Sequence, residues 1–171
     1  VTTLEQKFPE VIFIANTTNL GFSKGNNQGV KIAKGNHVCI LNPDTVVAED
    51  TFLKLLKFVK TKPNFGVVGC KLVDGTGRFL PESKRNVPII ERALKKLYGI
   101  DNTYYANHVE PDAVGEVDIL VGAFMFMKKK IYDQVGGFDE DYFMYGEDID
   151  LSYKLLKSGF QNYYFGKTTC I

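Results

Sequence analysis

The chain has 171 residues, 44% of them hydrophobic, and its 21 basic and 20 acidic side chains leave a formal net charge of +1. This length suits one domain with a sizeable buried core. The charges are interspersed, so the sequence shows no basic face for nucleic acid, and its longest apolar run (121–127) is far shorter than the ~20 residues that span a bilayer.

The N-terminal half alternates between segments of helical periodicity and short apolar segments typical of buried strands. In chain order these are a helix over 2–8, a strand over 11–14, a helix over 24–34, a strand over 38–41, a helix over 49–60 and a strand over 66–70. Such alternation predicts an α/β domain with a parallel sheet covered by helices.

The C-terminal half is less regular. Turn residues at 74–77 predict a hairpin over 71–80, while 81–112 reads as an irregular insertion with one helix (89–97) and is expected to lie near a site. Regular structure resumes with 117–127, a turn or short helix over 128–135, a helix over 147–158 that ends at Gly159, and a strand over 163–165.

The three cysteines, Cys39, Cys70 and Cys170, have no spacing that predicts zinc binding. Reduced thiols in a cytoplasmic protein are therefore expected. His37 and His108 are isolated, and we interpret them as surface or hydrogen-bonded residues rather than metal ligands.

Three carboxylates, Glu147, Asp148 and Asp150, stand at the start of the last predicted helix. Unpaired N–H groups and the helix dipole favour acidic residues there, so capping is one explanation. Helical spacing adds that Asp148 shares the apolar face with Leu151, whereas Asp150 faces outward with Lys154 as an i,i+4 partner. Asp148 is thus the candidate functional carboxylate.

Asn42, Pro43 and Asp44 directly follow the predicted strand 38–41. Ligands of open α/β sheets bind outside the carboxyl ends of the strands, and the proline holds the Asp44 carboxylate in a defined direction. The alternative is that Asn42 and Asp44 only form a turn, because Asn-Pro and Asp are strong turn formers.

The run from Asn19 to Gly29 is rich in glycine and side-chain amides. Gly21 and Gly25 allow close backbone approach, and consecutive amides near a helix start supply hydrogen-bond donors. The run matches neither a dinucleotide-binding GxGxxG pattern nor a Walker loop. It is either a generic polar loop or, beside the strand end that carries Asp44, a loop that touches a sugar or nucleotide.

Aromatic residues precede the acidic helix. We assign Phe138 and Phe143 to packing in the core. Tyr145 stays open between the core and the floor of a carbohydrate or nucleotide pocket.

Five short motifs occur in order along the chain. They are Asn19-Leu20-Gly21-Phe22 with Asn27-x-Gly29, Leu41-Asn42-Pro43-Asp44, Val121-Gly122-Ala123-Phe124-Met125, Gly137-Phe138-Asp139-Glu140, and Tyr145-Gly146-Glu147-Asp148-x-Asp150-Leu151. Each is weak alone, but together they resemble the family 2 glycosyltransferases, in particular the bacterial rhamnosyltransferase-like branch. The resemblance runs from about 11 to 171 and leaves 81–112 unmatched.

This resemblance implies a GT-A fold, a three-layer α/β/α domain with a mostly parallel mixed sheet, over the whole of 1–171. It implies an inverting transfer from a nucleotide-sugar donor, of the dTDP-rhamnose or UDP-sugar type, to a glycan or lipid-linked oligosaccharide acceptor in surface polysaccharide synthesis. The protein would then work at the inner face of the membrane, and 81–112 would shape acceptor choice.

The resemblance also implies residue roles. Asp44 would bind Mg²⁺ or Mn²⁺, Asp148 would be the catalytic base, and Glu147 would orient the base or the acceptor. The remaining matched positions would contact donor or acceptor: Asn42, Asn19, Gly21, Phe22, Asn27, Gly122, Ala123 and Tyr145.

Two family features are not matched: a first strand with a nucleotide-binding Asp, and a His beyond the last motif. The sequence therefore resembles a GT-A domain cut at both ends, with the first strand missing. The alternatives are a non-catalytic sugar- or nucleotide-binding fragment, and a nucleotidyltransferase, which would usually need a Gly-rich or basic phosphate loop that we do not find in the sequence.

Overall fold

The computed structural model describes residues 2–87 and 104–171. Its centre is a five-stranded sheet in the order β1-β6-β2-β7-β4. The strands are β1 His37–Leu41, β2 Phe65–Leu72, β4 Val114–Glu116, β6 Phe124–Lys128 and β7 Gln161–Cys170. β2 and β7 are parallel, whereas β6 pairs antiparallel with both β1 and β2, and β4 antiparallel with β7. The sheet is mixed, as the family resemblance implied, and not parallel, as the alternation of helices and strands predicted, because β6 and β4 run opposite to β1, β2 and β7.

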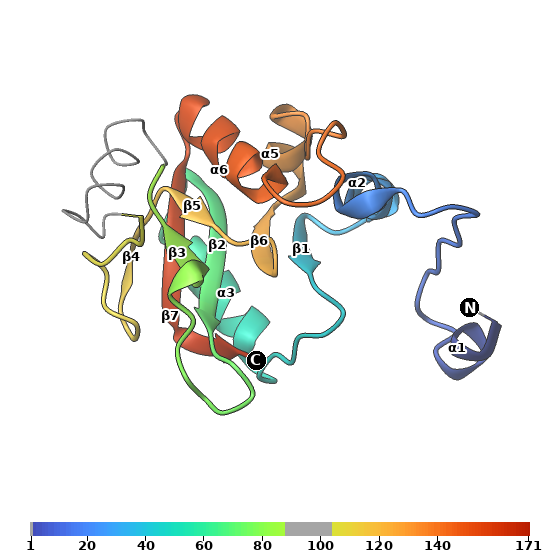
Figure 1. Ribbon diagram of the computed structural model, residues 1–171, viewed down its shortest axis with the longest axis horizontal. Coiled ribbons are helices and arrows are strands. Elements are labelled where there is room, and N and C mark those ends of the chain that lie inside the picture. The colour runs from blue at the N-terminus through green and yellow to red at the C-terminus, as the bar shows by residue number, and fades with distance from the viewer. Residues whose placement is uncertain (1, 88–103) are drawn as a thin grey trace.

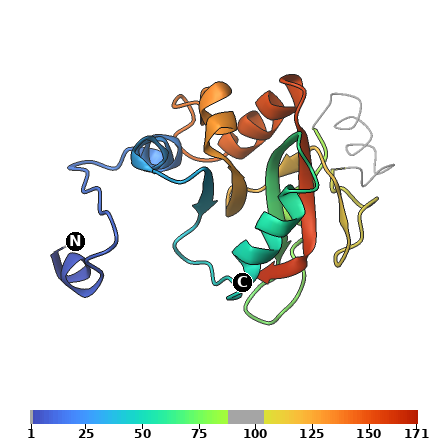
Figure 2. The ribbon, with the colours of Figure 1, turned by 180° about the vertical axis from the view of Figure 1, so that it is seen from behind.

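Helices cover both faces of this sheet (Figures 1 and 2). One face packs against α3 (Thr51–Val59), and the other against α2 (Gly21–Ile32), α5 (Lys129–Gln134) and α6 (Glu147–Lys157). Successive strand residues alternate between the two cores: Val67 lies in one and Val68 in the other. The predicted three-layer α/β/α arrangement is thus confirmed.

A two-stranded antiparallel ribbon lies beside the main sheet. It joins β3 (Lys84–Arg85) to β5 (Ile119–Leu120), and a 3-10 turn, η1 (Pro81–Ser83), precedes it. The Leu120 N–H donates to the Ser152 hydroxyl on α6 (3.3 Å), which ties the ribbon to that helix. The segment predicted to be irregular therefore begins with an ordered strand; its predicted helix (89–97) lies outside the described residues.

The predicted strand over 11–14 is wrong. Val11, Ile12 and Ile14 are 48%, 66% and 44% exposed and form no strand. A strand exists only through hydrogen bonds to a neighbour, and nothing in 2–87 or 104–171 pairs with this segment. It runs as an extended connection from α1 (Thr2–Lys7), which stands apart from the sheet (Figures 1 and 2).

Two smaller expectations also change. The predicted helix over 49–60 is shorter, since α3 covers Thr51–Val59. It buries Thr51, Leu55 and Val59, whereas Phe52 and Leu56 are each 37% exposed. The run 117–127 is interrupted, because β5 ends before a loop at 121–123 from which β6 begins.

The predicted turn and the predicted end of the last helix are confirmed. The turn near 74–77 is closed by a hydrogen bond from Asp74 N to Arg78 O (2.9 Å), and Gly159 ends α6 with a left-handed backbone. The three cysteines are free. Within the described residues, we find no helix that combines the length and the apolarity needed to cross a bilayer.

Candidate active site

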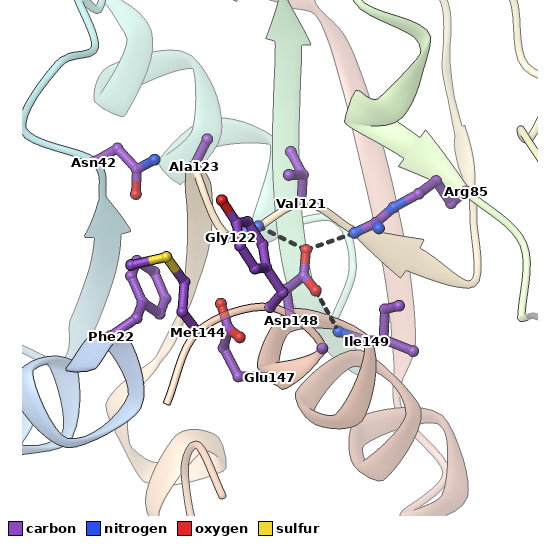
Figure 3. Close-up of a pocket in the computed structure, with 12 residues that line it drawn as sticks. Phe22, Asn42, Arg85, Val121, Gly122, Ala123, Met144, Glu147, Asp148 and Ile149 are labelled. Atoms are coloured by element: carbon purple, nitrogen blue, oxygen red, sulfur yellow. Dashed lines mark hydrogen bonds and ion pairs between the residues drawn. The ribbon is translucent and has the colours of Figure 1, made fainter. Parts of the chain in front are cut away.

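A cavity of about 430 Å³ opens where β1 ends and α6 begins (Figure 3). This volume lies within the range of small-molecule sites. Its wall is mostly apolar, with four side chains that carry amide or charged groups. The lining residues are Phe22, Asn42, Arg85, Val121, Gly122, Ala123, Met144, Tyr145, Gly146, Glu147, Asp148 and Ile149.

Five separate parts of the chain build this cavity. The start of α2 gives Phe22, and the residue after β1 gives Asn42. The ribbon and the loop behind it give Arg85 and the backbone of 121–123. The loop before α6 and the first turn of that helix give the rest. Figure 3 places Asn42 and Arg85 on opposite sides, with Asp148 nearer to Arg85.

Asp148 has hydrogen-bond partners on both carboxylate oxygens. Its Oδ2 accepts from Arg85 Nη2 at 2.5 Å and from Gly122 N at 3.1 Å, while Oδ1 accepts from Ile149 N at 2.8 Å. The residue is only 8% exposed. Asp148 thus faces inward, as the helical spacing predicted, and Asp150 pairs with Lys154 at 2.7 Å.

Arg85 is the site residue that the sequence reasoning missed. It is 9% exposed and forms an ion pair with Asp148, 63 residues further along the chain. Burial disfavours the charged guanidinium, but the attraction of Asp148 and a hydrogen bond to the Tyr104 hydroxyl (3.4 Å) outweigh it and raise the pKa of Arg85. In the sequence, Arg85 was marked only as part of the basic pair Lys84-Arg85, within the segment 81–112 that no family motif matched.

Glu147 lies next to Asp148 and is 6% exposed, and its Oε2 has no hydrogen-bond partner among the described residues. Burial raises the pKa of the Glu147 carboxyl above its ordinary value, and the negative charge of Asp148 raises it further. A buried polar atom without a partner is costly, so a polar group of a ligand is a natural partner for this oxygen.

The raised pKa of Glu147 predicts a pH-dependent stability. The folded state penalises ionised Glu147, so its stabilising contribution is complete below the ordinary pKa of 4.5 and is lost as the pH rises through the raised value. Glu147→Gln should therefore increase the Tm at pH 7, by about 2–4 °C for each kcal/mol recovered, and leave it unchanged near pH 4. Thermal unfolding of both proteins at the two pH values measures this.

Asp150→Asn is the matched control, because Asp150 lies in the same helical turn and is paired with Lys154. It should not raise the Tm at pH 7. An equal gain for Glu147→Gln at both pH values would contradict the assignment of the effect to ionisation.

Asn42 reaches the cavity wall, but Asp44, two residues further on, is exposed and does not line the cavity. Thr45 donates to the Asn42 carbonyl from both its hydroxyl (2.7 Å) and its N–H (3.3 Å), so the segment is also a turn. The predicted turn is therefore present, and it brings Asn42 to the cavity.

No group of three or more His, Cys, Asp or Glu side chains able to hold a metal ion occurs within 2–87 and 104–171. The strand end instead presents the Asn42 amide and the Asp44 carboxylate. Such an oxygen donor set fits Mg²⁺ or Mn²⁺, which are commonly held by one or two carboxylates while substrate phosphates and water complete the coordination.

The glycine-rich loop is close to the site at Gly21. Its φ is +79°, and a Cβ there would collide with the carbonyl oxygen of Phe143, to which Phe22 N donates at 2.8 Å. The expected close backbone approach is thus present at Gly21. It is absent at Gly25, where an added Cβ would point into open space with respect to the rest of the described chain.

The aromatic loop before α6 differs in part from expectation. Phe138 is buried, as predicted, but Phe143 is 55% exposed, and both its carbonyl oxygen and its ring lie close to Gly21 at the start of α2. Tyr145 lines the cavity mouth, is 83% exposed, and has a left-handed backbone (φ 70°) that is unusual for a tyrosine. Tyr145 therefore does not belong to the core.

Three of the predicted contact residues, Asn19, Gly21 and Asn27, are not among the residues that line the cavity. Asn19 accepts a hydrogen bond from Gly21 N at 2.9 Å and does not line the wall. Asn27 donates to Phe138 O and Glu140 Oε1, both at 3.0 Å, and accepts from the Tyr132 hydroxyl. These amides hold loops that shape the site, whereas Phe22, Asn42, Gly122, Ala123, Tyr145, Glu147 and Asp148 line it.

Sequence comparison finds a family match over almost the whole chain. Residues 1–170 match the family described as "Glycosyltransferase like family 2". The rhamnosyltransferase WbbL of Escherichia coli K12 is 30% identical over 84% of this chain and 57% of its own length. An N-acetylglucosaminyl-diphospho-decaprenol L-rhamnosyltransferase of Mycobacterium tuberculosis is 27% identical over 93% of this chain and 57% of its own. The chain thus spans little more than half of these relatives.

Solved structures show the same fold. GalNAc-T7 with UDP, GalNAc and Mn²⁺ superposes with a TM-score of 0.69 at 14% identity, over 99% of this chain and 33% of that one. The mannosyltransferase PcManGT of Pyrobaculum calidifontis, with GDP-Man and Mn²⁺, gives a TM-score of 0.66 at 19% identity, over 99% and 41%. The fold is therefore the predicted GT-A fold of glycosyltransferases.

Proposed function

Since the chain belongs to glycosyltransferase family 2, we propose that it transfers a sugar from a nucleotide-sugar donor to a hydroxyl of a glycan or lipid-linked acceptor. We propose a donor of the dTDP-rhamnose or UDP-sugar type, of which the two rhamnosyltransferase relatives favour a rhamnose donor, and a role in surface polysaccharide synthesis. A lipid-linked acceptor would bring the protein to the inner face of a membrane. The observation that carries the proposal is that Asn42 and Asp148, each singled out by the sequence, line one cavity.

The proposed reaction is one direct displacement. A sugar hydroxyl is a weak nucleophile at neutral pH, so a carboxylate base within hydrogen-bond reach should take its proton as it attacks. Asp148 is that base. The acceptor oxygen forms a bond to the anomeric carbon, the bond from that carbon to the diphosphate breaks, and the nucleoside diphosphate leaves with the electron pair. Attack from the face opposite the leaving group inverts the anomeric configuration.

Asp44 and Asn42 are the residues that we propose to hold a divalent metal ion, Mg²⁺ or Mn²⁺. When bound, such an ion neutralises charge on the departing diphosphate. Support comes from the oxygen ligands at this strand end and from the Mn²⁺ in the two structures of the same fold. Asp44 is exposed and therefore accessible to a donor diphosphate.

The remaining lining residues fit the proposed substrates. Phe22, Met144 and Tyr145 give the cavity an apolar wall near its mouth, suited to the face of a sugar ring. Glu147 Oε2, which lacks a partner among the described residues, is the proposed acceptor for a substrate hydroxyl. Among the described residues of the wall, Arg85 is the one basic side chain, and it is already paired with Asp148, so this part of the cavity offers little support for a nucleotidyltransferase.

A panel of nucleotide-sugars tests the proposal in the intact protein. Isothermal titration with Mn²⁺ should detect one preferred donor, and incubation of that donor with glycan or lipid-linked acceptors should give a glycosylated product of inverted anomeric configuration. If no nucleotide-sugar binds, or if the donors bind without any transfer to acceptor or water, the enzymatic function is wrong and a binding role replaces it.

A further inference from the structure

We propose that Arg85 is a positioning residue that commits one oxygen of Asp148, Oδ2, to the protein and so leaves the other, Oδ1, to take the proton of the acceptor. This inference rests on the proposed function and adds to it the atom that acts as the base and the residue that selects that atom.

The hydrogen bonds of Asp148 are distributed unequally between its two carboxylate oxygens. An ionised carboxylate has about four lone-pair positions, two on each oxygen. Arg85 Nη2 and Gly122 N occupy both positions of Oδ2, at 2.5 and 3.1 Å, whereas Ile149 N occupies one position of Oδ1, at 2.8 Å. Among the residues that the structure describes, no donor occupies the second position of Oδ1, which therefore stays open.

Both hydrogen-bond donors to Oδ2 come from the β3–β5 ribbon or from the loop that follows it. Arg85 pairs with Ile119 in the β3–β5 register, and Gly122 lies in the loop that leaves β5 (Figure 3). The ribbon is tied to α6 through Leu120 and Ser152, the same helix that carries Asp148. The ribbon is thus joined to α6 both through Asp148 and through Ser152.

The buried charges of Arg85 and Asp148 compensate each other. The side chains of Arg85 and Asp148 are 10% and 11% exposed, so little water is present to compensate either charge. The charged group beside Asp148 on its own helix is Glu147, a second buried carboxylate. Without Arg85, two neighbouring carboxylates at one helix start would repel each other, and Asp148 would lose the partner that holds it against the ribbon.

Lys84 provides a matched control on the same strand. It is buried (3% exposed) and cationic, but its Nζ donates to the Ala106 carbonyl at 2.9 Å and lies over the rings of Phe79 and Tyr164. It is not among the residues that line the cavity. Loss of Lys84 should disturb the ribbon region to a similar degree without touching Asp148.

The test compares Arg85→Gln, Arg85→Lys and Lys84→Gln in the intact protein. Arg85→Gln should lower kcat by about a hundredfold, because a misplaced base is costly, with the donor KM changed by less than about twofold. Arg85→Lys, which keeps the charge, should recover at least about tenfold of that loss. Lys84→Gln should leave kcat within about threefold of the wild type.

A second readout does not depend on transfer. The Gly122 amide is held by Asp148 Oδ2, so its hydrogen exchange should be about tenfold faster or more in Arg85→Gln and unchanged in Lys84→Gln. The positioning role of Arg85 would be overturned by either of two results for Arg85→Gln: exchange of the Gly122 amide as slow as in the wild type, or an unchanged kcat. Equal losses of kcat in Lys84→Gln and Arg85→Gln would overturn it as well. A wild-type protein that transfers no sugar would instead defeat the proposed function, while the exchange experiment still decides the role of Arg85.

Discussion

Asp148→Asn is expected to lower sugar transfer by about a thousandfold or more while the protein still binds its donor. General-base catalysis contributes about 10²–10⁴-fold, and asparagine has nearly the same shape but no basic carboxylate. Transfer of labelled sugar gives kcat, and isothermal titration with Mn²⁺ gives the donor Kd. The loss should appear in kcat, because the donor is expected to bind on the Asn42 side of the cavity.

This substitution has a structural consequence that must be measured with it. Arg85 would remain buried without its counter-charge, and breaking a buried ion pair commonly costs about 3–5 kcal/mol. The double variant Arg85→Gln with Asp148→Asn removes both charges and should unfold at a higher temperature than Asp148→Asn alone. If a folded Asp148→Asn protein turned over at the wild-type rate, Asp148 would not be the base.

Asp44→Ala is expected to remove most of the Mn²⁺-dependent donor affinity, with a rise in the donor Kd of about tenfold to a hundredfold. One carboxylate is the proposed protein anchor for the ion, and its loss leaves only the Asn42 amide at that strand end. Titration of the donor with Mn²⁺, and again with a chelator, measures the effect. The donor Kd of Asp44→Ala should exceed that of the wild type when Mn²⁺ is present, and the two Kd values should be equal when the chelator is present.

The stability of Asp44→Ala should change little, because Asp44 is exposed and surface substitutions usually cost within about 0.5 kcal/mol. Asp112→Ala is a suitable control: this carboxylate is 79% exposed, pairs with Lys71, and is not part of the cavity wall. Donor affinity should be unchanged in it. An Asp44→Ala protein with normal Mn²⁺-dependent affinity would remove Asp44 from the metal site.

Local chemistry in the sequence predicted much of the fold. Periodicity and turn residues indicated the helices of both halves, and the placement of Asp148 on the inner face of α6 follows from helical spacing alone. The approach of Gly21 to Phe143 follows from the absence of a side chain. These features depend on residues near one another in the chain or on the chemistry of a single residue.

The features that the sequence left open depend on distant pairings. β6 lies antiparallel between β1 and β2, which no local pattern specifies, and the apolar segment 11–14 has no partner among the described strands. Arg85 reaches the site only because the β3–β5 ribbon docks on α6. Asn27 looked like a ligand contact, but its amide is used to hold the loop at Phe138.

A structure of the intact protein with its donor and Mn²⁺ bound would show whether Asp148 faces the reacting carbon. We expect the nucleoside diphosphate at the strand end of Asn42 and Asp44, with the anomeric carbon in the cavity and its open face toward Asp148 Oδ1. A donor bound elsewhere, or one whose anomeric carbon faces away from Asp148, would contradict the proposed reaction.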